Sequence, residues 1–373
     1  MVSLTFMNHL RHRSLSGVST LKSVFFVLAI ALLPAGVLLL AFDYFASYAL
    51  PVPAMVQLPQ EGYLEFDQLQ MWRLRPGFSA GDIHISSQGF RSKLPPPSQP
   101  GKLVFLIGGS TVFGVGMPEE KTIAYFLQQL ADRNQPEKRL CFINAGVTAY
   151  YSTQELIHLE RNILQRSPAM VISLTGRNDA FYGLHPKYKP DAVPYHALLR
   201  QHLGALDPYY SSLESPPHSL HSVNWLRTKL KTAPFDWLRD FEVLKLSYKP
   251  AATEVFLRNA RSMSALLSGY GIEFHMFLQP TIRFPQRTLA PEEKPLVDDL
   301  YLAALDSGLA ELASACSASL PREWFHGFAL LPGDPGQRFI DNVHLNQDGA
   351  REVAQAIYSR VFGPPHPNGK QRF

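Results

Sequence analysis

The sequence has few cysteines, little net charge and no repeated segments. Its two cysteines are Cys141, in an apolar run expected to be a strand, and Cys316, in a helix-like run. We expect two buried, reduced thiols, and a disulfide between them is the alternative in an oxidising compartment. The net charge of +4 is too small and too scattered to indicate nucleic-acid binding. With 373 residues, the chain is expected to hold one ordinary domain with an insertion.

Several common active-site motifs are also missing. Glycines stand at positions 108, 109, 114 and 116, but no Gly-Lys-Ser/Thr follows and their spacing is not Gly-x-Gly-x-x-Gly, which excludes the usual phosphate loops. The Gly-x-Ser-x-Gly elbow that marks one large class of serine hydrolases is also absent. His218 and His221 have a spacing that metal ligands use, but they lie in a segment rich in serine and proline. A metal site there is the alternative to our expectation of no metal and no cofactor.

What the sequence does contain is a set of residues for acyl transfer, in four short segments: Gly109-Ser110-Thr111, Asn144-Ala145-Gly146, Gly176-Arg177-Asn178-Asp179 and Asp341-Asn342-Val343-His344. Ser110 is the predicted nucleophile, His344 its base, and Asp341 the group that orients the base. The predicted oxyanion donors are the Ser110 and Gly146 N–H groups and the Asn178 side-chain amide. Each type of group needed for serine catalysis is therefore present.

The first three segments each follow a short apolar run, at 102–107, 140–143 and 169–174. Such runs are typical of buried parallel strands, whose carboxyl ends meet at one edge of a sheet and bind ligands there. An amphipathic helix at 253–267 and a strand at 273–278 continue the alternation. The pattern predicts an α/β domain with a parallel sheet.

Each segment also has a simpler interpretation. Ser110 can cap a strand-to-helix turn, Gly146 can be an ordinary turn glycine, and Asp341 with His344 can be a buried structural pair. The three-residue offset between Asp341 and His344 nevertheless lets the carboxylate reach Nδ1 and leave Nε2 facing the serine. We expect Asp179 to cap or order its loop, and a final helix to run through Tyr358.

On these residues the sequence resembles the SGNH, or GDSL-like, hydrolase family over roughly residues 100–362. The resemblance implies a three-layer α/β/α domain with a parallel sheet, and a serine esterase or acyltransferase without a metal. It assigns the family's catalytic and oxyanion positions to Ser110, Gly146, Asn178, Asp341 and His344. The chain departs from the family where the usual acidic residue before the serine is Gly109 and the following leucine is Thr111. Gln88-Gly89-Phe90-Arg91-Ser92 is similar to a lead-in common in membrane-anchored bacterial members.

The N-terminus has the pattern of a signal anchor. Residues 1–22 contain Arg11, Arg13 and Lys22 without an acidic residue, and an uninterrupted apolar run follows within residues 23–43. Its length suits one transmembrane helix, and the preceding positive charge places the N-terminus in the cytoplasm. We therefore expect a single-pass protein of the cell membrane with an extracytoplasmic catalytic domain, periplasmic in a Gram-negative cell. Cleavage near Ser47-Tyr48-Ala49 is the alternative.

The remaining boundaries follow from composition. Residues 44–100, with Pro95-Pro96-Pro97 and Pro100, look like a stiff tether and lead-in. Residues 101–362 are the expected hydrolase domain, and 363–373 form a C-terminal tail. An insertion at about 181–250, rich in Tyr, His, Pro and Trp, either covers the active site or packs as a helical pair on its flank.

The predicted function is a serine esterase that acts outside the cytoplasm. We expect it to remove acyl groups, acetyl by default, from a small-molecule, glycan or lipid ester through an acyl-serine intermediate. An O-acyltransferase that moves an acetyl group to a polysaccharide is one alternative. A non-catalytic, membrane-attached binding or assembly protein is the other.

Overall fold

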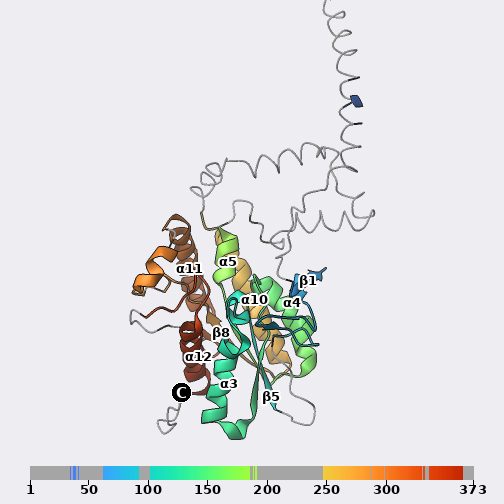
Figure 1. Ribbon diagram of the computed structural model, residues 1–373, viewed down its shortest axis with the longest axis vertical. Coiled ribbons are helices and arrows are strands. Elements are labelled where there is room, and N and C mark those ends of the chain that lie inside the picture. The colour runs from blue at the N-terminus through green and yellow to red at the C-terminus, as the bar shows by residue number, and fades with distance from the viewer. Residues whose placement is uncertain are drawn as a thin grey trace, which may run out of the picture. The chain divides into compact units, whose positions relative to one another are not determined.

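The computed structural model describes residues 62–91, 101–184, 247–285, 287–297, 299–329 and 336–363, and the single positions 34, 37, 38, 41, 188, 190 and 331 (Figure 1). The chain divides into two compact units. One consists of Met1–Val56 and Arg200–Arg239, and the other of Gln57–Leu199 and Asp240–Phe373.

In the first unit, the described residues Pro34, Val37, Leu38 and Ala41 are helical. Across the part of the chain that the structure describes, no helix combines the length and the apolar character that a bilayer crossing needs. The rest of the predicted anchor at 23–43 and the alternative cleavage site at Ala49 lie outside the described residues. Both therefore stay predictions.

A five-stranded parallel sheet lies at the centre of the second unit, in the order β6-β5-β7-β8-β9. Its strands are β5 Lys102–Gly108, β6 Leu140–Asn144, β7 Met170–Thr175, β8 Glu273–Leu278 and β9 Phe325–Phe328. After β5 the chain first adds β6 on one side and then crosses to add β7 on the other. Ligands of open α/β sheets bind at such a reversal, outside the carboxyl ends of the strands.

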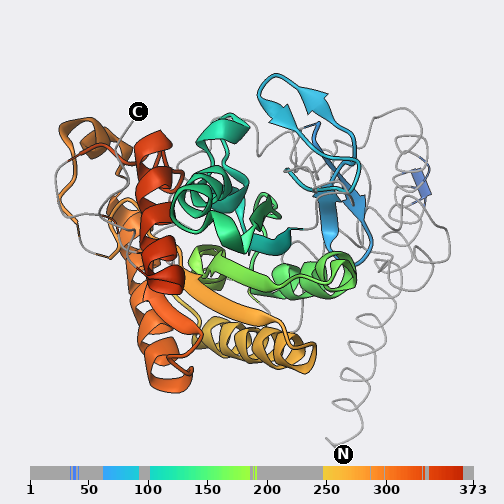
Figure 2. The same ribbon diagram turned by 90° about the horizontal axis from the view of Figure 1, so that it is seen from below.

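Helices cover both faces of this sheet, with α3 and α12 on one side and α10 on the other (Figure 2). The helices are α2 Ser110–Phe113, α3 Ile123–Asn134, α4 Ser152–His158, α5 Arg177–Gly183, α10 Pro250–Gly269, α11 Asp299–Ser319 and α12 Gln347–Phe362. Shorter turns are η1 Glu119–Lys121, η2 Pro136–Lys138, η3 Leu159–Ile163, η4 Leu164–Arg166 and η5 Pro291–Leu296. The described domain is thus a three-layer α/β/α fold, as the family resemblance implies.

The side chains of β5 show why this strand needs helices on both faces. Val104 and Leu106 belong to the core beneath α3 and α12, whereas Phe105 and Ile107 belong to the core beneath α4 and α10. All four are fully buried. Burial of a large apolar side chain contributes roughly 1.5–3 kcal/mol, so this short strand is a large source of stability.

The four strands predicted from apolar runs are confirmed, each to within one residue at either end. The sequence did not predict β9 or the full length of α11, because Phe325–Phe328 is only four residues long and contains His and Gly. Both cysteines are free: Cys316 is buried on α11, and Cys141 is half-buried on β6. Burial raises the pKa of the Cys316 thiol to about 12, so it is an unreactive core residue.

Residues 62–91 differ from a tether. They form two antiparallel hairpins, of β1 Leu64–Asp67 with β2 Met71–Leu74 and of β3 Ser79–Ala80 with β4 Ile83–His84. Tyr63 and Trp72 share a buried core with Phe113 from α2 and Val147 from the loop after β6. This part of the predicted tether at 44–100 therefore belongs to the folded second unit, because its aromatic side chains are buried there.

Arg91 joins this lead-in to the helix that begins with Ser110. Its buried guanidinium donates to the carbonyl groups of Phe113, Gly114 and Met117 and lies over the Phe113 ring. Burial lowers the pKa of Arg91 to about 10, although nearby carboxylates partly oppose this effect. The side chain is still charged at neutral pH and holds the carboxyl end of α2, where free carbonyl groups attract cations.

The insertion begins after α5 and ends before α10. At its base, the Lys249 N–H donates to the Gly183 carbonyl over 2.9 Å, so the chain leaves and re-enters the fold at the same place. Most of residues 185–246 lie outside the described residues. Whether the insertion covers the site or its flank therefore stays open, as does the metal alternative at His218 and His221.

Candidate active site

Ser110 lies at the sharp turn between β5 and α2. Gly108 ends the strand with φ 156°, and a side chain there would lie 2.4 Å from the Leu174 carbonyl oxygen. Only glycine lets β5 and β7 stay this close. Gly109 then precedes the first residue of α2, Ser110, which is half-buried. The turn leaves the hydroxyl group at the carboxyl edge of the sheet, as expected from the sequence.

The structure brings Ser110 together with two residues more than 200 positions away. His344 Nε2 lies 2.8 Å from Ser110 Oγ, and His344 Nδ1 lies 2.6 Å from Asp341 Oδ2. Asp341 Oδ1 accepts the Val343 and His344 N–H groups over 2.8 and 2.6 Å. Because the carboxylate accepts at both oxygens, Nδ1 is the donor and Nε2 is left to accept the serine proton.

The Asp341 carboxylate is ionised over the whole neutral range. Partial burial alone would raise its pKa, but hydrogen bonds from the His344 ring and from the two backbone N–H groups lower it to about 2. A fixed negative charge beside Nδ1 stabilises the imidazolium that forms when His344 takes a proton. Such an arrangement can supply a nucleophile, a base and a group that orients the base.

Asn178 lies beside the same turn, one residue inside α5. Its Nδ2 donates to the Tyr150 carbonyl over 2.7 Å, and its Oδ1 accepts from Arg177 over 3.2 Å. These two contacts fix which end of the amide is nitrogen. Among the described residues, no acceptor takes the second Nδ2 hydrogen. A side chain at Gly109 would meet this nitrogen at 2.7 Å, so the glycine in place of an acidic residue gives the amide room beside Ser110.

Asp179 orders this loop, as predicted. It is buried, and its carboxylate accepts the Ser152 N–H over 3.2 Å and the Ser152 hydroxyl over 2.5 Å. The carboxylate thus caps the start of α4 and joins the loop after β7 to the loop after β6. Burial raises the pKa of Asp179 to about 6 despite these hydrogen bonds. The contact therefore holds the segment that carries Asn178 against the segment that carries Tyr150.

Gly146 is not placed as an oxyanion donor, contrary to the prediction from the sequence. Its N–H donates to Asn144 Oδ1 over 3.1 Å, so the hydrogen points into its own loop. A side chain at this position would lie 2.4 Å from the Phe113 nitrogen. Gly146 therefore serves the close approach of its loop to α2, which is a packing role.

Ala149, three residues later in the same loop, has a feature that no sequence pattern indicated. Its φ is 62°, in the left-handed region, which is uncommon for a residue other than glycine. It is half-buried, and the next residue, Tyr150, accepts from Asn178. Among the described residues, no acceptor takes the Ala149 N–H. Such strained residues cluster at functional sites, and this N–H is an available donor beside Asn178.

The lead-in hairpins hold this loop in place. Trp72 Nε1 donates to the Thr148 carbonyl over 2.9 Å, and the Tyr150 hydroxyl donates to the Trp72 carbonyl over 2.6 Å. The Tyr63 hydroxyl lies 3.1 Å from Thr148 Oγ1. Residues flanking Ala149 are therefore bonded to residues 63 and 72, which gives the lead-in a direct part in building the site.

No metal cluster is present in the part of the chain that the structure describes, where no group of at least three His, Cys, Asp or Glu side chains is placed to hold an ion.

This chain is similar to known proteins in fold, and not detectably in sequence. No family model matches the sequence, and no curated protein matches it. The structure of an acetyl xylan esterase is 13% identical with a TM-score of 0.40, and the alignment covers 70% of this chain and 100% of the esterase chain. An acetylxylan esterase from Geobacillus stearothermophilus is 13% identical with a TM-score of 0.38, covering 70% and 94%. A putative lipolytic protein of the G-D-S-L family from Desulfitobacterium hafniense DCB-2 is 12% identical with a TM-score of 0.37, covering 70% and 100%.

Proposed function

We propose that this protein is a serine esterase that cleaves acyl esters through an acyl-enzyme on Ser110. The observation that carries the proposal is the chain of short contacts from Ser110 Oγ to His344 Nε2 and from His344 Nδ1 to Asp341 Oδ2, 2.8 and 2.6 Å long. Three groups aligned in this order can activate a hydroxyl group that is otherwise a weak nucleophile.

In the first half of the reaction, His344 Nε2 takes the Ser110 proton while Ser110 Oγ attacks the ester carbonyl carbon. The carbonyl electrons move to oxygen and form a tetrahedral oxyanion. When the oxyanion collapses, the bond to the alcohol oxygen breaks, and that oxygen takes the proton from the His344 imidazolium. The alcohol leaves, and the acyl group stays on Ser110.

In the second half, His344 takes a proton from water, whose oxygen attacks the acyl carbon. Collapse of the second tetrahedral species breaks the bond to Ser110 Oγ, which recovers its proton from His344. The products are a carboxylic acid and the free enzyme. If a sugar hydroxyl replaces water in this half, the same residues transfer the acyl group.

The oxyanion is stabilised by three N–H donors in this proposal: the Ser110 N–H, the second hydrogen of Asn178 Nδ2, and the Ala149 N–H in place of Gly146. Two contacts support it. Asn178 Nδ2 is bonded to the carbonyl of Tyr150, next to Ala149, and a side chain at Gly109, next to Ser110, would lie only 2.7 Å from this nitrogen. Donors set in advance by such contacts do not need to reorganise during the reaction.

We expect purified protein to hydrolyse an aryl acetate and to be labelled by a serine-reactive fluorophosphonate. A panel of acetylated glycans, each assayed for free acetate and for acetyl transfer to a deacetylated glycan, then separates an esterase from an O-acyltransferase. Absence of both labelling and turnover in folded protein would support the non-catalytic binding or assembly alternative and contradict the proposal.

The proposed location is the outer side of the cell membrane, with residues 23–43 as a single anchor. It rests on the apolar run and on Arg11, Arg13 and Lys22 before it. Protease added to cells with a permeable outer layer should digest the catalytic domain, and the full-length chain should sediment with membranes. A domain protected in intact spheroplasts, or a soluble chain shortened near Ala49, would contradict this topology. An anchored enzyme meets lipid-linked or newly made cell-surface glycans, which makes their acetyl esters the proposed substrates.

A further inference from the structure

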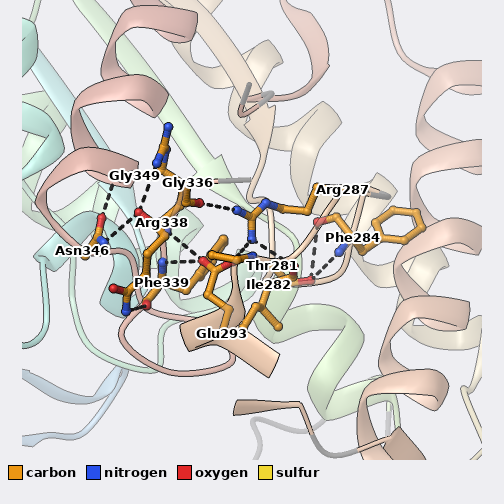
Figure 3. A network of polar contacts seen from close by, with 12 residues as sticks. Thr281, Ile282, Phe284, Arg287, Glu293, Gly336, Arg338, Phe339, Asn346 and Gly349 are labelled. Atoms are coloured by element: carbon orange, nitrogen blue, oxygen red, sulfur yellow. Dashed lines mark hydrogen bonds and ion pairs between the residues drawn. The ribbon is translucent and has the colours of Figure 1, made fainter. Parts of the chain in front are cut away.

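Glu293 is a fully buried carboxylate far in sequence from the catalytic residues. It lies in η5 with an exposed fraction of 0%, and it accepts four hydrogen bonds (Figure 3). Oε2 accepts from Arg287 Nη1 over 2.7 Å and from the Ala290 N–H over 3.0 Å. Oε1 accepts the N–H groups of Arg338 and Phe339 over 2.8 and 3.1 Å. The carboxylate therefore joins two separate segments of backbone.

Arg287 makes the same connection from the other side. Its Nη2 donates to the Gly336 carbonyl over 3.0 Å, and its guanidinium lies over the Phe339 ring (Figure 3). The side chains of Arg287 and Glu293 are 5% and 0% exposed. Together they contact the 336–339 segment at the Gly336 carbonyl, at the Arg338 and Phe339 N–H groups, and at the Phe339 ring.

That segment leads directly into the catalytic loop. Phe339 and Leu345 form an antiparallel bridge, the Ile340 N–H donates to the His344 carbonyl over 2.9 Å, and the Asn346 N–H donates to the Arg338 carbonyl over 2.9 Å. Asp341 and His344 thus stand on a closed loop, and Glu293 is bonded to one of the two strands at its base. A movement of the Arg338 and Phe339 backbone would pass to both catalytic side chains.

A buried ion pair is by itself weak evidence for stability, because desolvation opposes the attraction. Two features point to a more specific role. Burial would raise the pKa of Glu293, but hydrogen bonds from Arg338, Arg287 and Ala290 outweigh it and lower the pKa, so the carboxylate stays charged. Two of the four donors are the backbone N–H groups of Arg338 and Phe339, the two residues that precede Ile340 and Asp341 in the chain.

We propose that Glu293, held by Arg287, is a positioning residue that keeps the loop with Asp341 and His344 at the distance that Ser110 needs. The inference rests on the proposed function for its kinetic consequence, but the geometry of the loop can be measured without it. Glu293 acts through the backbone and touches neither the substrate nor the reacting atoms.

The test compares Glu293→Gln with Glu352→Gln. Glutamine keeps the size of Glu293 but has only one acceptor oxygen. Its NH2 group would therefore face an N–H donor, either of Arg287 or of the backbone, and one pair of hydrogen bonds would be lost. Glu352, on α12, is also a carboxylate bonded to the 336–346 segment, but among the described residues its hydrogen bond goes to the side chain of Arg338 and not to the backbone. The control therefore removes the same charge without touching the backbone N–H groups. Arg287→Lys, which loses the contact with the Gly336 carbonyl, takes the place of Glu293→Gln if that variant does not fold.

We expect Glu293→Gln to lower kcat by about 10–100-fold with KM nearly unchanged, because small displacements of catalytic groups are costly. Glu352→Gln should stay near the parent. In an Asp341→Asn background the effect of Glu293→Gln should largely disappear, since the orientation that it protects is already lost. An equal loss of kcat in both backgrounds would indicate a general structural role and overturn the proposal.

Hydrogen exchange provides the measurement that does not depend on activity. The Val343 and His344 N–H groups are bonded to Asp341 Oδ1, and peptides covering 337–346 should exchange faster in Glu293→Gln than in Glu352→Gln. If Glu293→Gln exchanges faster but the parent protein has no esterase activity, the proposed function is refuted and the role of Glu293 in positioning the loop is kept. Unchanged exchange and unchanged kcat in an active enzyme would refute the positioning role alone.

Discussion

Replacing Ser110 or His344 with alanine is expected to reduce turnover of an aryl acetate by about 10⁶-fold, near the scale measured for serine triads that act as a unit. The nucleophile and its base share one proton, across the 2.8 Å between Ser110 Oγ and His344 Nε2. The double variant should therefore be no worse than either single variant. Steady-state rates and fluorophosphonate labelling of the three variants measure this directly.

The hairpin of β3 and β4 offers a matched control. Ser79 Oγ lies 2.7 Å from His84 Nδ1, an exposed serine-histidine contact, and among the described residues no carboxylate is bonded to this histidine. Ser79→Ala should leave both turnover and labelling at the parent level. Activity retained in folded Ser110→Ala or His344→Ala protein would show that another residue is the nucleophile or the base.

The contacts among Ser110, His344 and Asp341 could be predicted because each of these residues has a local signal. Ser110 follows an apolar run that stops at two glycines, and Asp341 and His344 have the offset at which a carboxylate reaches an imidazole. Parallel strands bring their carboxyl ends together whatever the details of their packing. The order of the strands then places Ser110 and Asn178 just beyond the ends of two neighbouring strands, β5 and β7.

The conformation of the loop after β6, which carries the proposed oxyanion donor, could not be predicted in the same way. Gly146 looks like the donor because glycine exposes its N–H, but here the glycine is needed for packing against α2. Ala149 has the unusual φ instead, and an alanine carries no sequence signal for a left-handed backbone. That conformation depends on the bonds from Trp72, Tyr63 and Tyr182 to the loop, and all three are tertiary contacts.

Glu293 and the lead-in were missed for a related reason. Pro291-Glu292-Glu293-Lys294-Pro295 reads as a charged surface turn, and nothing local distinguishes the buried carboxylate from its exposed neighbour Glu292. The lead-in has short strands and many polar residues, so composition places it outside the core. Burial of both depends on partners at distant positions, such as Arg338 and Phe113, which single-sequence patterns do not reveal.

Asn178→Ala is expected to lower kcat by about 10²–10³-fold with a smaller effect on KM, the size of loss that follows removal of one oxyanion donor. The free Nδ2 hydrogen gains its charged acceptor only when the carbonyl oxygen becomes an oxyanion. The interaction is therefore stronger in the transition state than with bound substrate. Steady-state kinetics with an aryl acetate separate the two parameters.

Two further variants decide what the Asn178 amide does. Asn178→Asp keeps the shape of the side chain but removes both N–H groups and places a carboxylate near the oxyanion, so it should be at least as damaging as alanine. Asn134→Ala removes an amide that bonds to the Leu130 carbonyl at the end of α3, 2.8 Å away, and should leave kcat unchanged. If Asn178→Ala and Asn178→Asp raise KM alone, the amide binds the ground-state substrate. The developing charge would then rest on the Ser110 and Ala149 N–H groups, because the Gly146 N–H is already bonded to Asn144.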